Sequence, residues 1–450
     1  MLYRVTDPTG HITHFESASS DRSKAIIAVS ISSTFTIPRG SFMLPTFCDL
    51  HLHAPQFLYQ GTGLHLPLMK WLDEYAFKAE ERIDGDHDLA RRVYQRLAER
   101  LIENGTGAVL LFGTIKEETN LVLASVMQQA GIRALVGKLS MDISTRPTYT
   151  EHSASASLAS AESFINNIEA LMAPLPPHQR LVQPVLTPRF VPTCSNELLE
   201  GLGQLSARTG VMIQSHLAEA RDEVDWVRQE RGIDDFEVFE KANLLTPRTV
   251  QAHCTYLTPS EMSRLAEHGT SIAHCPLSNA YFSARRLPLR EALHAGVKIG
   301  LGTDIAGGYS ANVMGSMRWA VGVARMREGA RIEGENVGPK EDAENAHAET
   351  NLGLDWLESM YMATRGGAEA LGLECGVFKV GAPFDAQCLK LFDPETGRGV
   401  GALDFLDLES GSGDMTLSLE IVEKWWCLGD SRNRTDMWVQ GRRLGQKTIV

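Results

Sequence analysis

The protein has 450 residues, with 43 lysines and arginines against 56 aspartates and glutamates, so its formal net charge is −13 at pH 7. That balance argues against a nucleic-acid-binding protein, which needs a basic face to neutralise phosphates, and against docking on an anionic membrane. Hydrophobic residues make up 43% of the chain and charged residues 22%, which is typical of soluble globular proteins.

The N-terminal segment and the cysteines give information about the cellular location of the protein. No apolar run reaches the roughly 18 residues of a membrane-spanning helix, so none is predicted. The segment MLYRVTDPTGHITHF lacks the features of a signal peptide and the arginine-rich character of a transit peptide. The seven cysteines form no C-x-x-C pair, and their odd number does not suggest a disulfide framework. We therefore expect a cytoplasmic protein.

Short strands open the chain, with a turn at residues 7–10 and an alternating segment at residues 11–16. From residue 40 onward, short apolar runs alternate with helical patterns such as those at 88–104 and 121–130. The runs predicted as strands are residues 47–53, 107–113, 133–139, 181–187, 210–216, 249–253, 270–274 and 297–302. Eight such units predict an α/β fold of the (β/α)8 TIM-barrel type, although their periodicity also permits an open, doubly wound parallel sheet.

Strand-like segments return near the end of the chain, at residues 384–392 and 436–444. Residues 1–44 and 374–450 are therefore predicted to share one small β domain, beside a barrel formed by residues 45–373. Two further stretches are interpreted as surface insertions. Residues 153–163 are rich in serine and alanine and suit a loop or the start of a helix, whereas residues 325–352 are highly charged, as in a solvated loop or a frayed helix.

Five histidines and one aspartate fall at the ends of predicted strands: His51, His53, His216, His253, His274 and Asp304. The first two are two residues apart in a strand, so their imidazoles point to the same face. In a barrel, residues at the carboxyl ends of the strands face a common mouth. A lone histidine is more often a packed or surface residue, but this set predicts a metal site with nitrogen and oxygen ligands.

Glu219 lies three residues after His216. If the chain turns into a helix there, both side chains could face the mouth, where a carboxylate beside a metal is a natural proton shuttle. The alternative is a surface glutamate near a helix start, where negative charge is favourable in any case. The signatures H-E-x-x-H, G-x-S-x-G, G-x-G-x-x-G and Walker A are absent from the sequence.

Six segments together resemble the amidohydrolase superfamily, and more closely its guanine deaminases: PTFCDLHLHAPQF, LTPRF, QSHLAE, VQAHC, SIAHCPLSN and GLGTDIAGG. The H-x-H and G-T-D segments mark only the superfamily, whereas H-A-P-Q, T-P-R-F and S-H-x-x-E in combination point to guanine. The resemblance implies a distorted (β/α)8 barrel with a small flanking β domain built from the N- and C-terminal segments. It also suggests a homodimer.

The resemblance implies a role for each matching residue. One Zn²⁺ would be held by His51, His53, His216 and Asp304. Catalysis would involve Glu219 as the proton shuttle, together with Asp304 and His253. The substrate guanine would be contacted by Gln56, Arg189, Phe190, His216 and Glu219, with the first two at the purine edge and the phenyl ring against the base. An activated water would attack C2 of guanine, releasing ammonia and leaving xanthine.

Several of these residues also have structural interpretations. Arg189 could pair with a structural carboxylate, Gln56 could fill a loop, and Phe190 could belong to the core. Trp71 suits the core as well as a pocket wall, and His274 is expected to pack or to orient residues 275–279. Two other functions stay open: a neighbouring amidohydrolase that acts on a pterin, a triazine or another aminated ring, and a non-catalytic binding protein on the same barrel.

Overall fold

The computed structural model describes residues 2–30, 35–335, 351–404 and 417–445. Eight parallel strands form its central sheet, in the order β11-β10-β9-β8-β7-β6-β5-β4. They are β4 (Phe47–His53), β5 (Thr106–Phe112), β6 (Arg133–Ser140), β7 (Val182–Pro188), β8 (Met212–Leu217), β9 (Thr249–His253), β10 (Ser271–His274) and β11 (Ile299–Leu301). Each matches one of the eight predicted strands, with small shifts at the ends.

The sheet closes into a barrel where the chain after β11 meets β4. Asp304 donates its backbone N–H to the carbonyl of His51 (2.8 Å), and His53 donates to the carbonyl of Ile305 (2.9 Å). The Asp49 carboxylate accepts bonds from the backbone N–H (2.9 Å) and the hydroxyl (2.5 Å) of Thr303. Because a loop closes the ring, the barrel is distorted. The (β/α)8 prediction is confirmed, and the open sheet is excluded.

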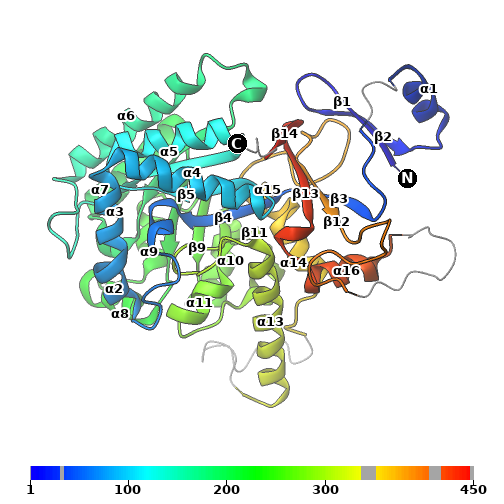
Figure 1. The fold of residues 1–450 in the computed structure, drawn as a ribbon. Coiled ribbons are helices and arrows are strands. Elements are labelled where there is room, and N and C mark those ends of the chain that lie inside the picture. The colour runs from blue at the N-terminus through cyan, green and yellow to red at the C-terminus, as the bar shows by residue number, and fades with distance from the viewer. Residues whose placement is uncertain (1, 31–34, 336–350, 405–416, 446–450) are drawn as a thin grey trace.

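Helices surround the barrel (Figure 1). They are α2 (Leu68–Trp71), α3 (Phe77–Asp84), α4 (His87–Glu103), α5 (Glu117–Ala130), α6 (Ala154–Met172), α7 (Asn196–Thr209), α8 (Arg221–Arg231), α9 (Asp235–Lys241), α10 (Pro259–Glu267), α11 (Pro276–Phe282), α12 (Leu289–His294), α13 (Val313–Ile332), α14 (Trp356–Ala363) and α15 (Arg365–Ala370). The helices predicted at residues 88–104 and 121–130 are confirmed as α4 and α5. None of the described helices combines the length and the apolar character needed to cross a membrane.

The two stretches interpreted as insertions contain parts of regular helices. Ser153 caps α6 by accepting a bond from the N–H of Ala156 (3.2 Å), so the predicted helix start is confirmed. The interpretation of residues 153–163 as an insertion is wrong, because this helix is the barrel's own connection between β6 and β7. α13 extends into the charged stretch as far as Ile332. Residues 336–350 of that stretch lie outside the described residues.

The two ends of the chain build the smaller part of the fold (Figure 1). It contains a four-stranded antiparallel sheet, a two-stranded hairpin and two helices: β3 (Ser41–Pro45), β12 (Ala386–Lys390), β13 (Arg434–Val439), β14 (Arg442–Leu444), β1 (Leu2–Thr6), β2 (Ile12–Ser17), α1 (Asp21–Ser30) and α16 (Leu419–Leu428). β12 lies between β3 and β13, so an N-terminal strand pairs directly with C-terminal ones. The flanking β unit is confirmed, and the boundaries at residues 44 and 374 stay a prediction.

A buried ion pair joins the barrel to this smaller unit. Arg133, at the start of β6, donates from Nε (2.5 Å) and Nη2 (3.0 Å) to the two carboxylate oxygens of Asp385. The same carboxylate accepts the backbone N–H of Gln440 (2.7 Å). Burial opposes the charge on Arg133, but Asp385 holds the pKa of the guanidinium above its ordinary value. Both side chains therefore have hydrogen-bond partners inside the protein.

We predict that Arg133→Ala lowers the free energy of unfolding by about 3–5 kcal/mol, because it leaves the Asp385 carboxylate buried without its cation. Urea denaturation of the full chain, followed by circular dichroism, measures the change. Arg96→Ala is the control, since it removes an exposed pair with Glu99 and should cost less than about 1 kcal/mol. Equal losses in the two variants would contradict the assignment of a stabilising link.

Candidate active site

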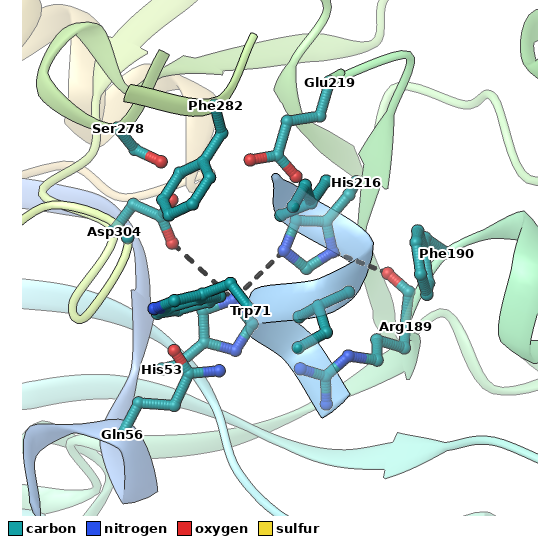
Figure 2. A pocket seen from close by; sticks show the side chains of 13 residues that line it. His53, Gln56, Trp71, Arg189, Phe190, His216, Glu219, Ser278, Phe282 and Asp304 are labelled. Atoms are coloured by element: carbon teal, nitrogen blue, oxygen red, sulfur yellow. Dashed lines mark hydrogen bonds and ion pairs between the residues drawn. The ribbon is translucent and has the colours of Figure 1, made fainter. Parts of the chain in front are cut away.

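Four side chains converge at the mouth of the barrel. His51 and His53 come from β4, His216 comes from β8, and Asp304 follows β11. The Nε2 atoms of His53 and His216 are 3.0 Å apart, and Asp304 Oδ1 lies 3.0 Å from His51 Nε2 and 3.6 Å from His53 Nε2. The structure thus brings together the four residues predicted to hold a metal, three of which are labelled in Figure 2.

This cluster has the chemistry of a metal site. The possible ligand atoms of His51, His53 and His216 all lie within 4.8 Å of one another. His51 Nε2 is buried with no hydrogen-bond partner among the described residues. Burial, reinforced by neighbouring imidazoles, lowers the pKa of His53 and His216 well below its usual value, so both rings are neutral and offer a lone pair. Three imidazoles and a carboxylate suit Zn²⁺ and similar divalent ions.

Neighbouring groups fix the imidazole rings. The carbonyl of Arg189 lies 2.6 Å from His216 Nδ1 and can only accept, so Nδ1 carries the proton and Nε2 is free to bind a metal. Phe112, at the end of β5, packs against the rings of His51, His53 and His216 with centroid distances of 4.7–4.8 Å. The sequence does not single out Phe112, because an aromatic residue in a buried strand is indistinguishable from ordinary core.

Backbone conformations that favour glycine occur at three points of the mouth. Ala218, His253 and Asp304 have φ values of 50°, 69° and 50°. Such residues persist only where surrounding contacts hold them. Asp304 is held by its bond to β4, described above, and Thr255 Oγ1 donates to the carbonyl of Ala218 (3.1 Å). The left-handed turns let the chain leave each strand abruptly, with a functional side chain directed at the mouth.

His253 and Glu219 face the cluster from β9 and from the loop after β8. His253 Nε2 is 3.6 Å from Glu219 Oε2 and 3.8 Å from Asp304 Oδ2. Burial lowers the pKa of His253 to about 4. Burial also raises the pKa of Glu219 well above its usual value, and the charge of Asp304 adds to that rise. Burial raises the pKa of Asp304, but the opposing effects of His51 and other neighbours leave this pKa below its usual value. The Glu219 carboxyl group therefore favours the protonated form, whereas the Asp304 carboxyl group favours the ionised form.

Glu219 lies in a loop and not in a helical turn. The Glu223 carboxylate accepts the backbone N–H groups of Glu219 (2.7 Å) and Ala220 (3.2 Å), and Thr255 Oγ1 donates to the carbonyl of Glu219 (2.7 Å). The expected helical turn is wrong, because Ala218 takes a left-handed conformation and α8 begins only at Arg221. The expected direction is right, since the Glu219 side chain lines the cavity at the mouth (Figure 2).

A small cavity lies over the cluster. The predicted substrate residues Gln56, Arg189 and Phe190 all line it (Figure 2). Trp71 and Phe282 form a further wall, with ring centroids 5.1 Å apart. Phe190 and Trp71 are each only 3% exposed, as expected of core residues, and both also line the cavity, as expected of pocket residues.

Glu80 is a residue of this site that the sequence prediction missed. It lies on α3 and accepts bonds from Gln56 Nε2 (2.9 Å) and Arg189 Nη1 (2.6 Å). Arg189 therefore does pair with a buried carboxylate, and it lines the cavity as well. A signal was available, because Glu80 shares a helix face with buried Phe77 and Ile83. A carboxylate at an apolar position of an amphipathic helix requires a buried partner.

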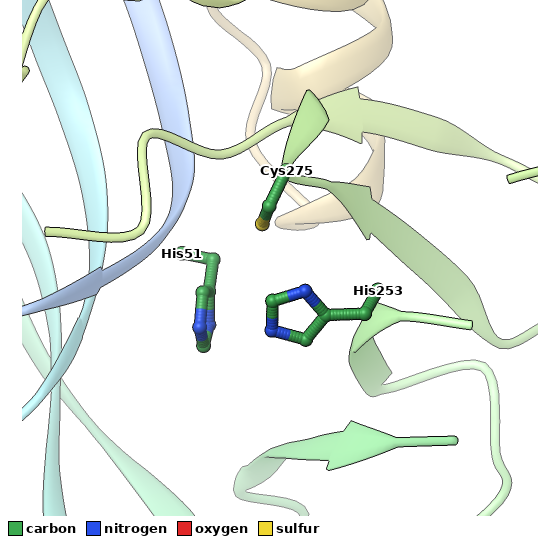
Figure 3. A group of neighbouring side chains, drawn as sticks. All are labelled: His51, His253 and Cys275. Carbon is green, nitrogen blue, oxygen red and sulfur yellow. The ribbon is translucent and has the colours of Figure 1, made fainter. Parts of the chain in front are cut away.

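His274 and Cys275 lie behind the cluster. The Cys275 sulfur and the ring nitrogens of His51 and His253 form a group within 4.8 Å (Figure 3). Burial, together with the charges of nearby carboxylates, raises the pKa of the Cys275 thiol well above its usual value. Burial lowers the pKa of His274 to about 3. Both are thus neutral, buried groups, and His274 is outside the metal cluster, as the sequence predicts.

Comparison with known proteins places this geometry in a family. Residues 42–444 match the amidohydrolase family. A guanine deaminase of Dictyostelium discoideum is 34% identical over 412 residues, and one of Mus musculus is 36% identical over 408; each alignment covers 90% of this chain and 83% of the relative. The structure of guanine deaminase from C. acetobutylicum with bound guanine aligns with a TM-score of 0.82 and 29% identity, covering 99% of this chain and 94% of that one. The chain belongs to the amidohydrolase family.

Proposed function

We propose that this protein is a guanine deaminase, which hydrolyses the 2-amino group of guanine to give xanthine and ammonia. The observation that carries the proposal is a single cavity that joins a metal-binding cluster, Glu219 and a polar edge formed by Gln56 and Arg189. Support comes from relatives named guanine deaminase that align over 90% of the chain, and from the similar structure with guanine bound.

Arg189 and Gln56 would bind the polar edge of the base. Arg189 Nη2 is buried with no partner among the described residues. The planar guanidinium suits O6 and N7 of guanine, which both accept hydrogen bonds. Phe190 would lie against the ring, and Trp71 and Phe282 would enclose it on another side. Enclosure by these rings would exclude bulk water and strengthen the polar contacts.

One Zn²⁺ would be held by His51, His53, His216 and Asp304, whose imidazole nitrogens and carboxylate oxygen fit such an ion. When bound, the metal supplies Lewis acidity that makes a water molecule nucleophilic near neutral pH. The same ligand types also bind Fe²⁺, so elemental analysis of the purified protein is the measurement that distinguishes the two metals.

Asp304 and Glu219 would move the protons. Asp304 would accept a proton from the attacking water as the O–C2 bond forms, while Glu219, which burial keeps protonated, would give its proton to N3. The amino group would then take the proton from Asp304 and leave as ammonia when the C2–N bond breaks. The remaining hydroxyl proton would return to Glu219, leaving a carbonyl at C2. His253, neutral at its lowered pKa, would hydrogen-bond to the attacking water.

The homodimer and the cytoplasmic location remain predictions from the sequence. All seven cysteines are free and six of them are buried, which is in keeping with a reducing compartment. Light scattering of the purified protein measures the oligomeric state, and microscopy of a tagged chain in its own cell measures the location.

We predict that the purified protein converts guanine to xanthine and carries about one zinc ion per chain. Ultraviolet absorbance follows the reaction, with adenine and cytosine as control substrates and metal analysis on the same sample. Metal without turnover of guanine would contradict the proposed substrate and would direct attention to pterins, triazines and other aminated rings. A folded, metal-free protein without turnover would favour a binding role.

We predict that removal of the metal by a chelator abolishes turnover and lowers the melting temperature, because a ligand that binds only the folded state stabilises it. Added Zn²⁺ should restore both properties. Turnover and differential scanning calorimetry on the same samples provide the two measurements. Full activity in protein that metal analysis finds empty would contradict the assignment of the cluster.

We predict that Glu219→Gln lowers kcat by about 10²–10⁴-fold, because the amide cannot shuttle a proton. Metal content and melting temperature should stay close to those of the unmodified protein. Glu230→Gln is the matched control, since Glu230 is an exposed residue of the next helix, α8, and should retain full activity. A variant at Glu219 with kcat unchanged would show that the proton travels by another route.

A further inference from the structure

Glu80 reaches the pocket only through other residues. Its side chain is fully buried and does not line the cavity. Its carboxylate accepts bonds from Gln56 Nε2 (2.9 Å) and from Arg189 Nη1 (2.6 Å). Any influence of this charge on a bound molecule is therefore exerted by Gln56 and Arg189, which do line the cavity.

Glu80 decides which way the Gln56 amide points. An ionised carboxylate only accepts hydrogen bonds, so the amide nitrogen of Gln56 must face it. At its other end, the amide oxygen accepts the backbone N–H of Ala306 (3.1 Å). Turning the amide over would place two acceptors together at Glu80 and two donors together at Ala306. The orientation is fixed, and the nitrogen keeps a second N–H that neither partner uses.

Glu80 also holds the guanidinium of Arg189. Nη1 is bound to the carboxylate, and Cζ lies 4.9 Å from the centre of the Phe77 ring, so the group is held from two sides. Burial opposes the charge, but Glu80 holds the pKa of Arg189 above its ordinary value. The Nη2 atom is buried and has no partner within the described part of the chain. A guanidinium can only donate, so it offers N–H groups to whatever occupies the cavity.

We propose that Glu80 is a positioning residue that makes the pocket select a 6-oxo purine over a 6-amino purine. This inference rests on the proposed guanine deaminase function and deepens it. Gln56 and Arg189 each keep N–H groups that are not bonded to Glu80. These donors match the carbonyl oxygen at C6 and the ring nitrogen N7, which are both acceptors. An amino group at C6 would face these N–H groups with N–H groups of its own, so buried donors would be left without acceptors. A purine of this kind would therefore bind much more weakly.

The test compares guanine with 2,6-diaminopurine, which carries the same amino group at C2 but an amino group in place of the oxygen at C6. The ratio of the two kcat/KM values reports recognition at C6, because the bond that breaks is the same. In Glu80→Gln the side chain has one accepting oxygen in place of two, so Gln56 and Arg189 cannot both keep their orientation. We expect the ratio to fall by about tenfold or more, with guanine losing more than 2,6-diaminopurine.

Glu81→Gln is the matched control. It makes the same chemical change one position along α3, where the side chain is partly exposed and pairs with Arg146 (2.7 Å) away from the cavity. Both kcat/KM values and their ratio should stay unchanged. Metal content and melting temperature of each variant show whether it is folded.

The outcomes are distinct. A folded Glu80→Gln variant in which both substrates lose the same factor would overturn the proposal and leave Glu80 with a structural role. If that variant does not fold, Glu80→Asp replaces it, because the shorter side chain keeps the charge but cannot reach both partners, and the same fall in the ratio is expected. Absence of guanine turnover in the unmodified protein would instead overturn the proposed function on which this inference rests.

Discussion

The segment from Thr303 to Ile305 is bonded to β4 in register, and this contact positions the rest of the site. The backbone of Asp304 is tied to His51, that of Ile305 to His53, and the hydroxyl and N–H of Thr303 to Asp49. The same few bonds close the barrel and place Asp304, the last of the four residues predicted to hold a metal, beside His51 and His53. Burial raises the pKa of Asp49 to about 6, and its hydrogen bonds to Thr303 oppose that rise.

The site places groups of opposite proton preference within a few ångströms. Burial keeps the imidazoles of His53 and His216 neutral. Glu219 is kept protonated by burial and by the charge of Asp304, and Asp304 is kept ionised by His51. None of these states follows from the residue type alone, because each depends on the neighbours and on exclusion of water. Ala218, His253 and Asp304 adopt the left-handed backbone conformation at three strand ends. This conformation is unfavourable for residues other than glycine, and it accompanies the convergence of these groups at one point.

Most of the fold could be predicted from the sequence. Buried parallel strands appear as short apolar runs, and the helices between them carry recognisable periods and caps, so all eight strands were located. Closure could not be predicted in this way, because open and closed sheets use the same β/α units. It depends on bonds between residues such as Asp49 and Thr303, which are 254 positions apart. Local composition also misassigned residues 153–163, since serine and alanine suit a helix start as well as a loop.

The sequence by itself determined the types and order of the side chains predicted to hold a metal and which of them share a strand face. It did so because a period of two in a strand and a common carboxyl edge are local rules. Only the tertiary structure decided the hydrogen-bonding roles of Gln56 and Arg189, the packing of Phe112 and the part of Glu80. These depend on which distant segments meet and on how far burial excludes water. A carboxylate on a helix has no defined partner until the strands and loops around it are in place.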